Sequence, residues 1–438
     1  MTALTCPDQL LLHPVSGPVH ATVTLPGSKS ITNRALLLAA LADGDSRLQF
    51  PLHSDDTFYM AEALRGLGVV IEELSPGGDF LVRGTGGTFL APKKTLFIGN
   101  SGTTVRFLTA AACLAPAGTD VVLDGVARMR ERPIRDLLGA LLTLGVSAES
   151  INGHGCPPVC VRGGGLPGGS CRLRGDVSSQ FLTALLQVAP YAQQAVSIQI
   201  IGDLISKPYI DITEAVMHSF GVVMENDNYQ RLSVPAGQRY TGREYKIEAD
   251  ASNASYFLAA AAVTGGTVTL ENLGSDSIQG DIAFADVLER MGCTVNRGAK
   301  ITVTGPLKLR GIDADMEAIP DTAQTLAIVA AFADGPSRLT GLASLRVKET
   351  DRLKAITTEL SKLGVTVDES HDSWTITPPP GGEYLSAEID TYDDHRMAMS
   401  FAVASLRLSG ITINDPGCVA KTFPDFWLRW ERVFGHGK

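Results

Sequence analysis

The chain has 438 residues, of which 44% are hydrophobic and 19% charged, and its formal net charge is −10. This length allows two large domains or several small ones. The acidic balance argues against a nucleic-acid binder, so any anion site must be built locally from a few cations. The apolar runs are too short to span a bilayer, and the N-terminus lacks a charged n-region followed by an apolar stretch. We therefore expect a cytoplasmic protein with no membrane or nucleic-acid partner.

The seven cysteines form an odd, scattered set. Cys156 and Cys160 are close in sequence, but no matching Cys or His pair completes a zinc site. We interpret the cysteines as reduced structural thiols and expect neither a bound metal nor a cofactor.

Residues 25–44 read LPGSKSITNRALLLAALADG, a proline-glycine turn that leads through polar residues into an apolar helix. Lys29, Ser30 and Arg34 are therefore expected near a helix N-terminus, where free N–H groups and the helix dipole favour an anion. The segment is not a P-loop, because Thr22 stands where the first glycine would be required. A helix start with solvated cations is the alternative.

The chain repeats one unit six times: an apolar helix, a glycine turn and a β-branched strand. The six copies are 35–50, 105–124, 181–202, 256–273, 325–342 and 397–415. Most are followed by a second helix that ends in a glycine and then a strand. These helix-ending glycines are Gly68, Gly145, Gly221, Gly292 and Gly364. They recur about every 75 residues, too long a period for a solenoid of small repeats.

Glycine at these positions is expected to take the left-handed conformation that ends a helix. Each unit is then large enough for a βαβαβ element, and right-handed crossovers predict that much of its sheet is parallel. Six such units indicate two three-unit domains of α/β class. The polar stretch 238–245 is the natural crossing between them, and the segment before Pro26 is expected to pair with the second domain.

Four motifs in the first half could contribute to an anion site. A glycine-rich turn enters a helix at 99–106, three arginines lie within 128–133, a serine pair opens a helix at 176–181, and a Ser-Lys-Pro-Tyr turn follows a strand at 206–209. Free N–H groups and arginines bind phosphate and carboxylate. The alternatives are a tight turn, a solvated charge run and simple helix N-caps.

The second half adds three clusters. Asp321 opens the fifth unit's helix and could be an N-cap alone. In RVKETDR, Lys348 and Arg352 are expected on one helical face, and Glu349 lies three residues before Arg352, which would give an ion pair of a few tenths of a kcal/mol. DDHR at 393–396 opens the sixth helix, and Lys421 follows a strand.

Taken together, cations from both halves lie at helix starts or in adjoining loops. They are Lys29, Arg34, Arg128, Lys348, Arg352, Arg396 and Lys421. Two such faces closing on each other would form a positive cleft for a small molecule that carries several phosphates or carboxylates.

The motifs resemble those of the EPSP synthase family (3-phosphoshikimate 1-carboxyvinyltransferases) over about residues 20–426. They are LPGSKSITNRALLLAALADG, GNSGTTVRF, RMRERPI, DVSSQFLTALL, DLISKPYIDIT, DASNASYFLAAAA, IPDTAQT, RVKETDRL, DDHRMAM and AKTFPDF. The resemblance implies two similar domains of three βαβαββ units each, an inside-out α/β barrel architecture with a two-crossing hinge. It places the first domain at 28–245, the second at 1–27 plus 246–438, and the active site in the cleft between them.

The resemblance also implies the reaction: enolpyruvyl transfer from phosphoenolpyruvate to the 5-hydroxyl of shikimate 3-phosphate, without metal or covalent intermediate, by a monomer. Asp321 would be the base at the 5-hydroxyl, Glu349 the proton donor to C3 with His395 as its partner, and Lys29 a proton shuttle. The implied shikimate 3-phosphate contacts are Lys29, Ser30, Arg34, Ser178, Ser179, Gln180, Ser206, Tyr209, Asp321, Ser344 and Lys348. The implied phosphoenolpyruvate contacts are Lys29, Asn100, Gly102, Arg128, Gln180, Arg352, Arg396 and Lys421.

Two motifs depart from the family pattern, at three positions. Ser344 stands where many relatives have an asparagine that contacts the shikimate ligand, and serine is shorter. Ser101 and Phe107 replace the alanine and proline of the GNAGTAMRP form of the glycine turn. Phe107 is expected to narrow the space beside phosphoenolpyruvate and to change the sensitivity to glyphosate, the family's inhibitor at that subsite.

Two other functions remain open. The sister enolpyruvyl transferase that acts on UDP-N-acetylglucosamine uses a loop cysteine, and the stretch 128–133 contains none. A non-catalytic anion-binding module would not need Lys29, Asp321 and Glu349 together.

Overall fold

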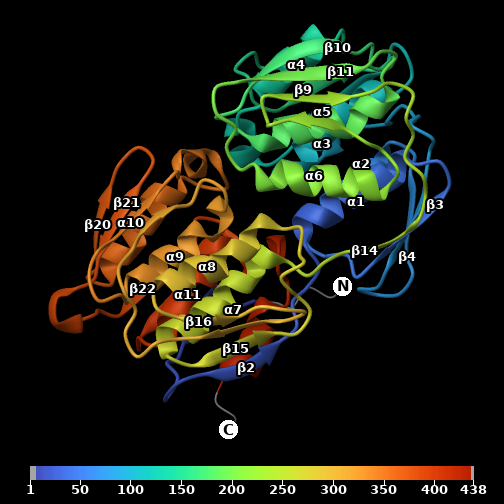
Figure 1. Cartoon of the computed structure of the whole chain (residues 1–438). Helices are drawn as coiled ribbons and strands as arrows, with labels where there is room; N and C mark the ends of the chain where they lie inside the picture. Colours follow the sequence, from blue (N-terminus) through green and yellow to red (C-terminus); the bar gives the residue numbers. More distant parts are fainter. Residues whose placement is uncertain (1–5, 436–438) are drawn as a thin grey trace. The chain divides into compact units, whose positions relative to one another are not determined.

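The computed structural model describes residues 6–435, and these divide into two compact units (Figure 1). Unit 1 runs from Gly27 to Ile247. Unit 2 combines the N-terminal stretch that ends at Pro26 with the chain from Glu248 onward. The expected second domain, 1–27 plus 246–438, includes residues 1–5 and 436–438, which lie outside the described residues. Across 6–435, we find no helix with the length and apolarity needed to cross a bilayer.

Unit 1 contains six α-helices among its described residues: α1 (Lys29–Leu41), α2 (Asp55–Gly66), α3 (Gly102–Ala111), α4 (Arg135–Thr143), α5 (Ser179–Val188) and α6 (Pro208–Ser219). Its short 3₁₀ segments are η1 (Ala112–Leu114), η2 (Ala127–Glu131) and η3 (Ala189–Tyr191). Its strands are β3 (Asp45–Gln49), β4 (Val70–Glu73), β5 (Phe80–Arg83), β6 (Leu96–Phe97), β7 (Asp120–Asp124), β8 (Ala148–Ser150), β9 (Val159–Arg162), β10 (Gly169–Arg174), β11 (Val196–Ile201), β12 (Glu225–Asp227), β13 (Arg231–Val234) and β14 (Glu244–Lys246).

The described part of unit 2 also has six α-helices: α7 (Ala251–Thr264), α8 (Phe284–Arg290), α9 (Ala323–Ala330), α10 (Arg352–Lys362), α11 (His395–Ser405) and α12 (Phe426–Phe434). Its 3₁₀ segments are η4 (Gly280–Ala283), η5 (Pro320–Thr322), η6 (Ala343–Val347), η7 (Pro380–Gly382) and η8 (Pro416–Lys421). Its strands are β1 (Gln9–Leu12), β2 (His20–Val23), β15 (Thr267–Leu270), β16 (Thr294–Asn296), β17 (Ile301–Thr304), β18 (Asp313–Asp315), β19 (Ser337–Thr340), β20 (Thr366–Glu369), β21 (Trp374–Thr377), β22 (Ala387–Ile389) and β23 (Ile411–Asn414).

The strands form six small sheets, three in each unit, and the fold is mixed α/β. The order β6–α3–β7–α4–β8–β9 shows the expected βαβαββ unit, and β10 to β13 and β18 to β21 repeat it with their helices. Two copies take their first strand from a distant segment: β14 pairs with β3, and β2 pairs with β15. The segment before Pro26 therefore belongs to the sheets of unit 2, since β1 also pairs with β23.

Less of each sheet is parallel than the crossovers predicted. In the sheet β10-β11-β13-β12, only β10 and β11 run parallel, and the two other pairs are antiparallel. The other four-stranded sheets have the same pattern. The first helix of each unit makes a parallel crossover, but the last two strands form a hairpin whose second strand returns beside the central strand.

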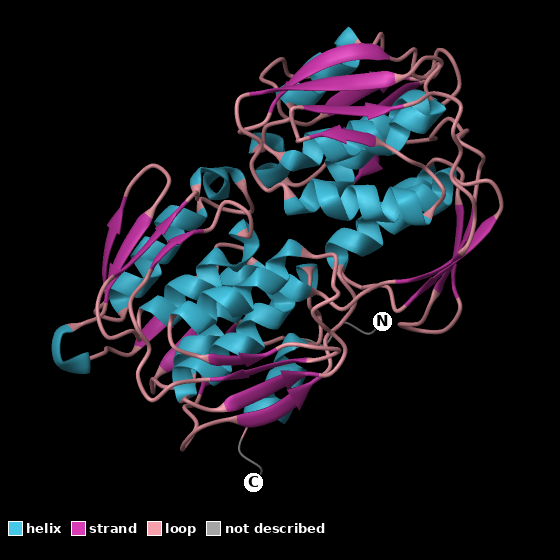
Figure 2. Ribbon diagram, in the orientation of Figure 1, coloured by secondary structure: helices cyan, strands magenta, loops and turns pink. Residues whose placement is uncertain are grey.

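Helices fill the interior of each unit, and the strands lie at its periphery (Figure 2). In unit 1, α3 is buried along its whole length, and α1 is buried from Ile31 to Leu41. In unit 2, α9 and α11 are buried throughout, and α7 nearly so. Because these helices have no exposed face, polar side chains on them must find partners inside the unit or in a ligand.

The helix ends follow local sequence as expected. The five glycines predicted to end the outer helices, Gly68, Gly145, Gly221, Gly292 and Gly364, all have φ between 83° and 105°. Several helix starts are capped by oxygen-bearing side chains, such as Ser28 on α1 and Asp250 on α7.

Candidate active site

The first turns of α1, α3 and α5 lie together at one end of unit 1. Lys29 is the first residue of α1, Gly102 the first of α3, and Ser179 the first of α5. Asn33 of α1 donates a hydrogen bond to Thr103 of α3 over 2.6 Å, which ties these two helices at their beginnings. The predicted anion-binding residues of the first half thus come from neighbouring helix N-termini, where N–H groups are free of intrahelical partners.

The buried side chain of Arg34 links α1 to α6 at this end of unit 1. Its guanidinium donates to the Thr213 hydroxyl at 2.9 Å, the Ser30 carbonyl at 2.8 Å and the Tyr209 carbonyl at 3.0 Å. The side chain is buried, and burial lowers its pKa to about 10. In residues 6–435 no carboxylate lies within ion-pair distance of it. A buried cation without an opposite charge is costly, so the geometry favours an anion nearby.

Two arginines that sequence reasoning did not select lie beside Gly102. A Cβ atom on Gly102 would lie 2.6 Å from nitrogens of both Arg106 and Arg132. Arg132 also donates to the Asn100 carbonyl over 3.1 Å. Arg128, the predicted residue of this stretch, instead pairs with Glu131 at 2.8 Å near the surface. The three arginines within 128–133 indicated that this stretch could bind an anion. The sequence alone did not show which of them lies beside Gly102.

The remaining predicted residues of unit 1 lie at helix starts and turns. Ser178 caps α5, and its hydroxyl accepts from the N–H of Gln180. Oε1 of Gln180 is shielded from solvent and has no hydrogen-bond partner in the described part of the chain, so it can accept from a ligand hydroxyl. Ser206 has φ of 55°, a strained value for serine that is typical of functional turns. Lys29 pairs with Asp56 of α2 at 3.4 Å.

In unit 2, three cations converge on Asp321. Nη2 of Arg396 donates to its carboxylate over 2.8 Å, Nη1 of Arg352 lies at 3.5 Å, and Nζ of Lys348 lies at 3.7 Å. Asp321 sits inside η5, where Ile319 is the N-cap, so its interpretation as a helix cap is wrong. Lys348 and Arg352 come from the same β18 to β21 unit as Asp321, and Arg396 comes from α11, which follows β22.

Arg352 connects Asp321 to two further carboxylates. It donates to Asp394 at 2.7 Å and to Glu349 at 2.8 Å, and its own side chain is 1% exposed. Burial opposes its charge, but Asp394 and Glu349 more than offset this and raise its pKa above the ordinary value. The predicted Glu349–Arg352 pair is thus confirmed, but as a buried contact rather than a surface pair worth a few tenths of a kcal/mol.

The expectation that Lys348 and Arg352 share a helical face is wrong. Helix α10 begins at Arg352 with Asp351 as its N-cap, so Lys348 lies in the preceding turn after η6. Both residues still reach Asp321 because that turn folds back beside η5. Ser344 lies half-buried in η6, and its ligand contact stays a prediction.

Two more predicted residues complete this cluster. Lys421, at the end of η8, lies 3.8 Å from Glu349. His395 is buried at the start of α11, with Nδ1 3.6 Å from Asp394. The cluster brings four cations together around three carboxylates, and such cations can bind the phosphates and carboxylates of a polyanionic ligand.

Sequence reasoning missed Asp281 of η4. Its carboxylate accepts a hydrogen bond from Ser252 in the first turn of α7. Burial, with a further contribution from the negative charge of Asp321, raises its pKa to about 6. An aspartate in a short polar turn is ordinarily expected at the surface, so only the fold reveals that Asp281 is buried. Within 6–435 we find no His, Cys, Asp and Glu cluster suited to hold a metal ion.

Comparison with known proteins gives one consistent family. The family model described as EPSP synthase (3-phosphoshikimate 1-carboxyvinyltransferase) matches residues 15–430. The chain is 50% identical to the chloroplastic 3-phosphoshikimate 1-carboxyvinyltransferase of Arabidopsis thaliana, covering 98% of this chain and 85% of that protein. It is also 50% identical to the enzyme of Janthinobacterium sp. (strain Marseille), covering 95% and 96%.

A solved structure has the same fold. The EPSP synthase of Acinetobacter baumannii superimposes with a TM-score of 0.81 at 29% sequence identity, covering 97% of this chain and 98% of that one. The chain therefore belongs to the EPSP synthase (3-phosphoshikimate 1-carboxyvinyltransferase) family.

Proposed function

We propose that the protein transfers the enolpyruvyl group of phosphoenolpyruvate to the 5-hydroxyl of shikimate 3-phosphate and releases phosphate. The observation that carries this proposal is the Asp321 carboxylate held by Arg396, Arg352 and Lys348. A carboxylate that can accept a hydroxyl proton, set among cations that bind phosphate, matches a reaction between an alcohol and a phosphorylated acid.

The proposed reaction has two steps. In the first, Asp321 accepts the proton of the 5-hydroxyl, the oxygen bonds to C2 of phosphoenolpyruvate, and C3 gains a proton. In the second, the tetrahedral adduct loses a proton from C3 while the bond from C2 to the phosphate oxygen breaks. The products are the enolpyruvyl ether and inorganic phosphate.

Glu349 is the proposed donor of the C3 proton. Its carboxylate lies 2.8 Å from Arg352 and 3.8 Å from Lys421, so two residues proposed to bind phosphoenolpyruvate also hold the proposed proton donor. His395 would then act through Asp394 as a positioning residue rather than by direct contact.

The residues of unit 1 are proposed to bind and orient the substrates. Lys29 would contact both ligands and move a proton, while Gly102 and Asn100 would supply the phosphoenolpyruvate subsite. The buried guanidinium of Arg34 would neutralise the shikimate anion over a short distance and hold the Ser30 and Tyr209 backbone that lines its site. We add Arg106 and Arg132 to this subsite, because they flank Gly102.

We further propose that the substrates bind between the two units and that the two crossings near residues 26–27 and 247–248 act as a hinge. The expected domain ranges, the monomeric state and the cytoplasmic compartment belong to this proposal too. Titration with both ligands, followed by small-angle scattering, tests it: compaction supports a closing cleft, and an unchanged radius of gyration contradicts it.

A phosphate-release assay tests the function itself. Phosphoenolpyruvate is supplied with shikimate 3-phosphate in one arm and with UDP-N-acetylglucosamine in the other. We expect release with shikimate 3-phosphate alone. Release with the UDP-sugar alone would establish the sister transferase instead, and release with neither would favour a binding module.

A further inference from the structure

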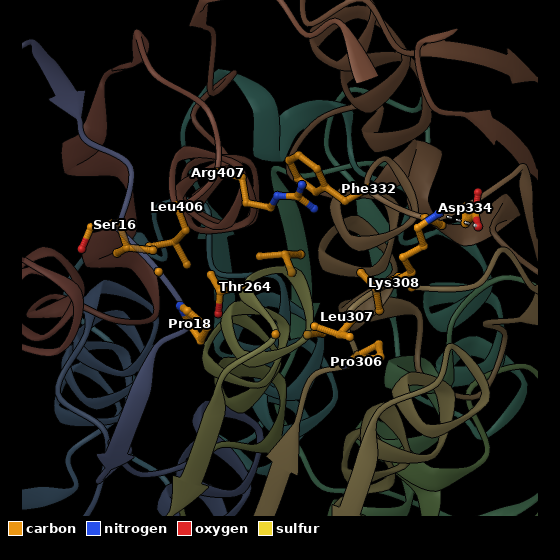
Figure 3. Close-up of a pocket in the computed structure, with 17 residues that line it drawn as sticks. Ser16, Pro18, Thr264, Pro306, Leu307, Lys308, Phe332, Asp334, Leu406 and Arg407 are labelled. Carbon is orange, nitrogen blue, oxygen red and sulfur yellow. Dashed lines mark ion pairs between the residues drawn. The ribbon is translucent and has the colours of Figure 1, made fainter. Parts of the chain in front are cut away.

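Unit 2 contains a cavity of about 600 Å³, whose lining residues Figure 3 shows. It is lined by the C-terminal ends of α7, α9 and α11 and by residues 15–18 and 306–309. The cluster lies at the N-terminal ends of α9 and α11. Since α11 has 11 residues at 1.5 Å each, the cavity and the cluster are about 15 Å apart along that helix. The cavity is therefore separate from the proposed active site.

The corresponding end of unit 1 is filled by two tyrosine rings. Tyr240 is fully buried and donates to the Gln187 carbonyl, and the Tyr191 hydroxyl donates to the Leu41 carbonyl. The two ring centroids are 5.8 Å apart. Arg239 covers the Tyr191 ring, with Cζ 5.1 Å from its centroid. Two aromatic rings under one arginine thus close this end of the unit.

The two units can be aligned through equivalent backbone bonds. In unit 1, the N–H of Arg47 donates to the Arg243 carbonyl over 3.0 Å, next to the parallel pair β14 and β3. In unit 2, the N–H of Thr267 donates to the Val19 carbonyl over 2.6 Å, next to the parallel pair β2 and β15. Val19 therefore occupies the place of Arg243.

This alignment shows where the tyrosine rings are missing. Tyr240 lies three residues before Arg243, and Ser16 lies three residues before Val19. Ser16 therefore occupies the position of Tyr240. Leu406 lies five residues before β23, as Tyr191 lies five residues before β11. Both Ser16 and Leu406 line the cavity. Unit 2 thus keeps the shape of this end but lacks the two rings that fill it in unit 1.

The walls of the cavity define the chemistry of a ligand. Phe332 and Leu309 give it apolar faces, and the Arg407 guanidinium lies 5.0 Å from the centre of the Phe332 ring (Figure 3). Within the described residues Arg407 makes no ion pair. Lys308, also on the rim, pairs only loosely with Asp334 at 3.8 Å. Ring-stacked arginine is suited to bind a planar carboxylate, and a cavity of several hundred Å³ suits a small molecule.

We propose that this cavity binds a small aromatic carboxylate, whose ring takes the place that Tyr240 fills in unit 1 and whose carboxylate pairs with Arg407. The ligand would bridge the ends of α7, α9 and α11, the same helices whose beginnings carry the proposed catalytic cluster. The site is independent of the proposed function, since none of its residues belongs to the proposed active site.

Calorimetric titration of the full chain with 3-phenylpropionate, and with the uncharged 3-phenylpropionamide, tests the proposal. We expect the carboxylate to bind with a Kd in the millimolar range or below, at least about tenfold tighter than the amide. Arg407→Gln should weaken the carboxylate about tenfold and leave the amide unchanged. Lys308→Gln should change the Kd only about two- to threefold, because this lysine already has a carboxylate partner.

Ser16→Tyr is the second variant, since it restores the ring of unit 1. It should abolish binding of both compounds by filling the cavity, whereas Ser16→Ala should leave binding intact. All four variants should release phosphate from phosphoenolpyruvate at the wild-type rate. Absence of carboxylate binding at about 10 mM, equal affinity for the amide, or undiminished binding to Ser16→Tyr would each overturn the proposal.

Discussion

Neutralising Asp394 tests whether the buried ion cluster stabilises unit 2. Asp394 has no exposed surface, accepts from Arg352 at 2.7 and 3.2 Å, and caps α11 by accepting from the Arg396 N–H at 2.9 Å. Asp394→Asn keeps an oxygen for the cap but removes the charge. Asp394→Ala removes both, so the two variants separate the ion pair from the cap.

The expected loss in the free energy of unfolding depends on which carboxylates Arg352 still contacts after Asp394 is replaced. Removing a buried ion's only partner costs about 3–5 kcal/mol. Arg352 keeps Glu349 at 2.8 Å and Asp321 at 3.5 Å, so it is not left without an opposite charge. We therefore expect Asp394→Asn to lower the free energy of unfolding by about 2 kcal/mol, in the range for a hydrogen bond between charged groups. Asp394→Ala also removes the cap and leaves a small void, so we expect it to lower the free energy of unfolding by about 4 kcal/mol in total.

The chain supplies its own reporter for this measurement. Its three tryptophans, Trp374, Trp427 and Trp430, all belong to unit 2. The buried indole of Trp374 donates to the carbonyl of Leu353, the neighbour of Arg352. Urea unfolding followed by tryptophan fluorescence therefore reports on this unit.

Asp286→Asn is the matched control. Asp286 pairs with Arg297, which also keeps a second carboxylate, Glu289, at 2.8 Å, but this pair is exposed. We expect the control to change the free energy by less than about 0.5 kcal/mol. If Asp394→Asn lost no more than the control, the buried cluster would contribute no net stability and our reasoning would be refuted.

Three further predictions concern single residues. Lys29→Met should lower turnover by about 10²–10⁴-fold while the circular dichroism spectrum stays that of the wild type, and near-normal turnover would contradict its role as proton shuttle. Phe107→Pro should change the inhibition constant for glyphosate and, because proline breaks an interior bond of α3, destabilise unit 1 by about 3 kcal/mol. Phe107→Leu separates the two effects, since it removes the ring that lies 5.4 Å from Arg34 but keeps the helix, and an unchanged inhibition constant in both variants would refute the idea. Asp281 has a pKa raised from 3.8 to about 6, so its contribution to stability is present below pH 4 and is lost as the pH rises through 6. Asp281→Asn, which stays neutral, should therefore gain up to about 3 kcal/mol relative to the wild type between about pH 4 and pH 7 in urea unfolding, and a pH-independent difference would contradict this.

Local features of the fold could be predicted because their causes are local. The glycine after each outer helix must take a positive φ, and Gly68 and Gly364 do so whatever surrounds them. Serine and aspartate before apolar helices become caps, as Ser178 and Asp394 show. Strand direction was not predictable in this way, because a hairpin and a crossover are distinguished by pairing with strands far along the chain.

The candidate site was predictable in its members but not in its contacts. The cations near Asp321 come from the turn after η6, from α10 and from α11, so only the packed unit shows that they share one carboxylate. Arg128 and Arg132 lie in the same arginine-rich stretch. Arg128 pairs with Glu131 near the surface, whereas Arg132 lies beside Gly102. Asp281 could be recognised as a candidate residue only from its burial in the folded unit.

The pairing of β1 with β23 and of β2 with β15 has a consequence for how the chain is made. Unit 1 is continuous from Gly27 to Ile247, so a ribosome delivers all of it in one stretch. The first 26 residues emerge earlier but must wait for partners, because Gln9 pairs with Asn414 and His20 with Thr267. At a synthesis rate of about 5–20 residues per second, Gln9 waits roughly 20–80 seconds for its partner. Two strands are thus unpaired for most of translation, when aggregation and chaperone capture compete with folding, and a circular permutant that begins at Gly27 would remove that delay.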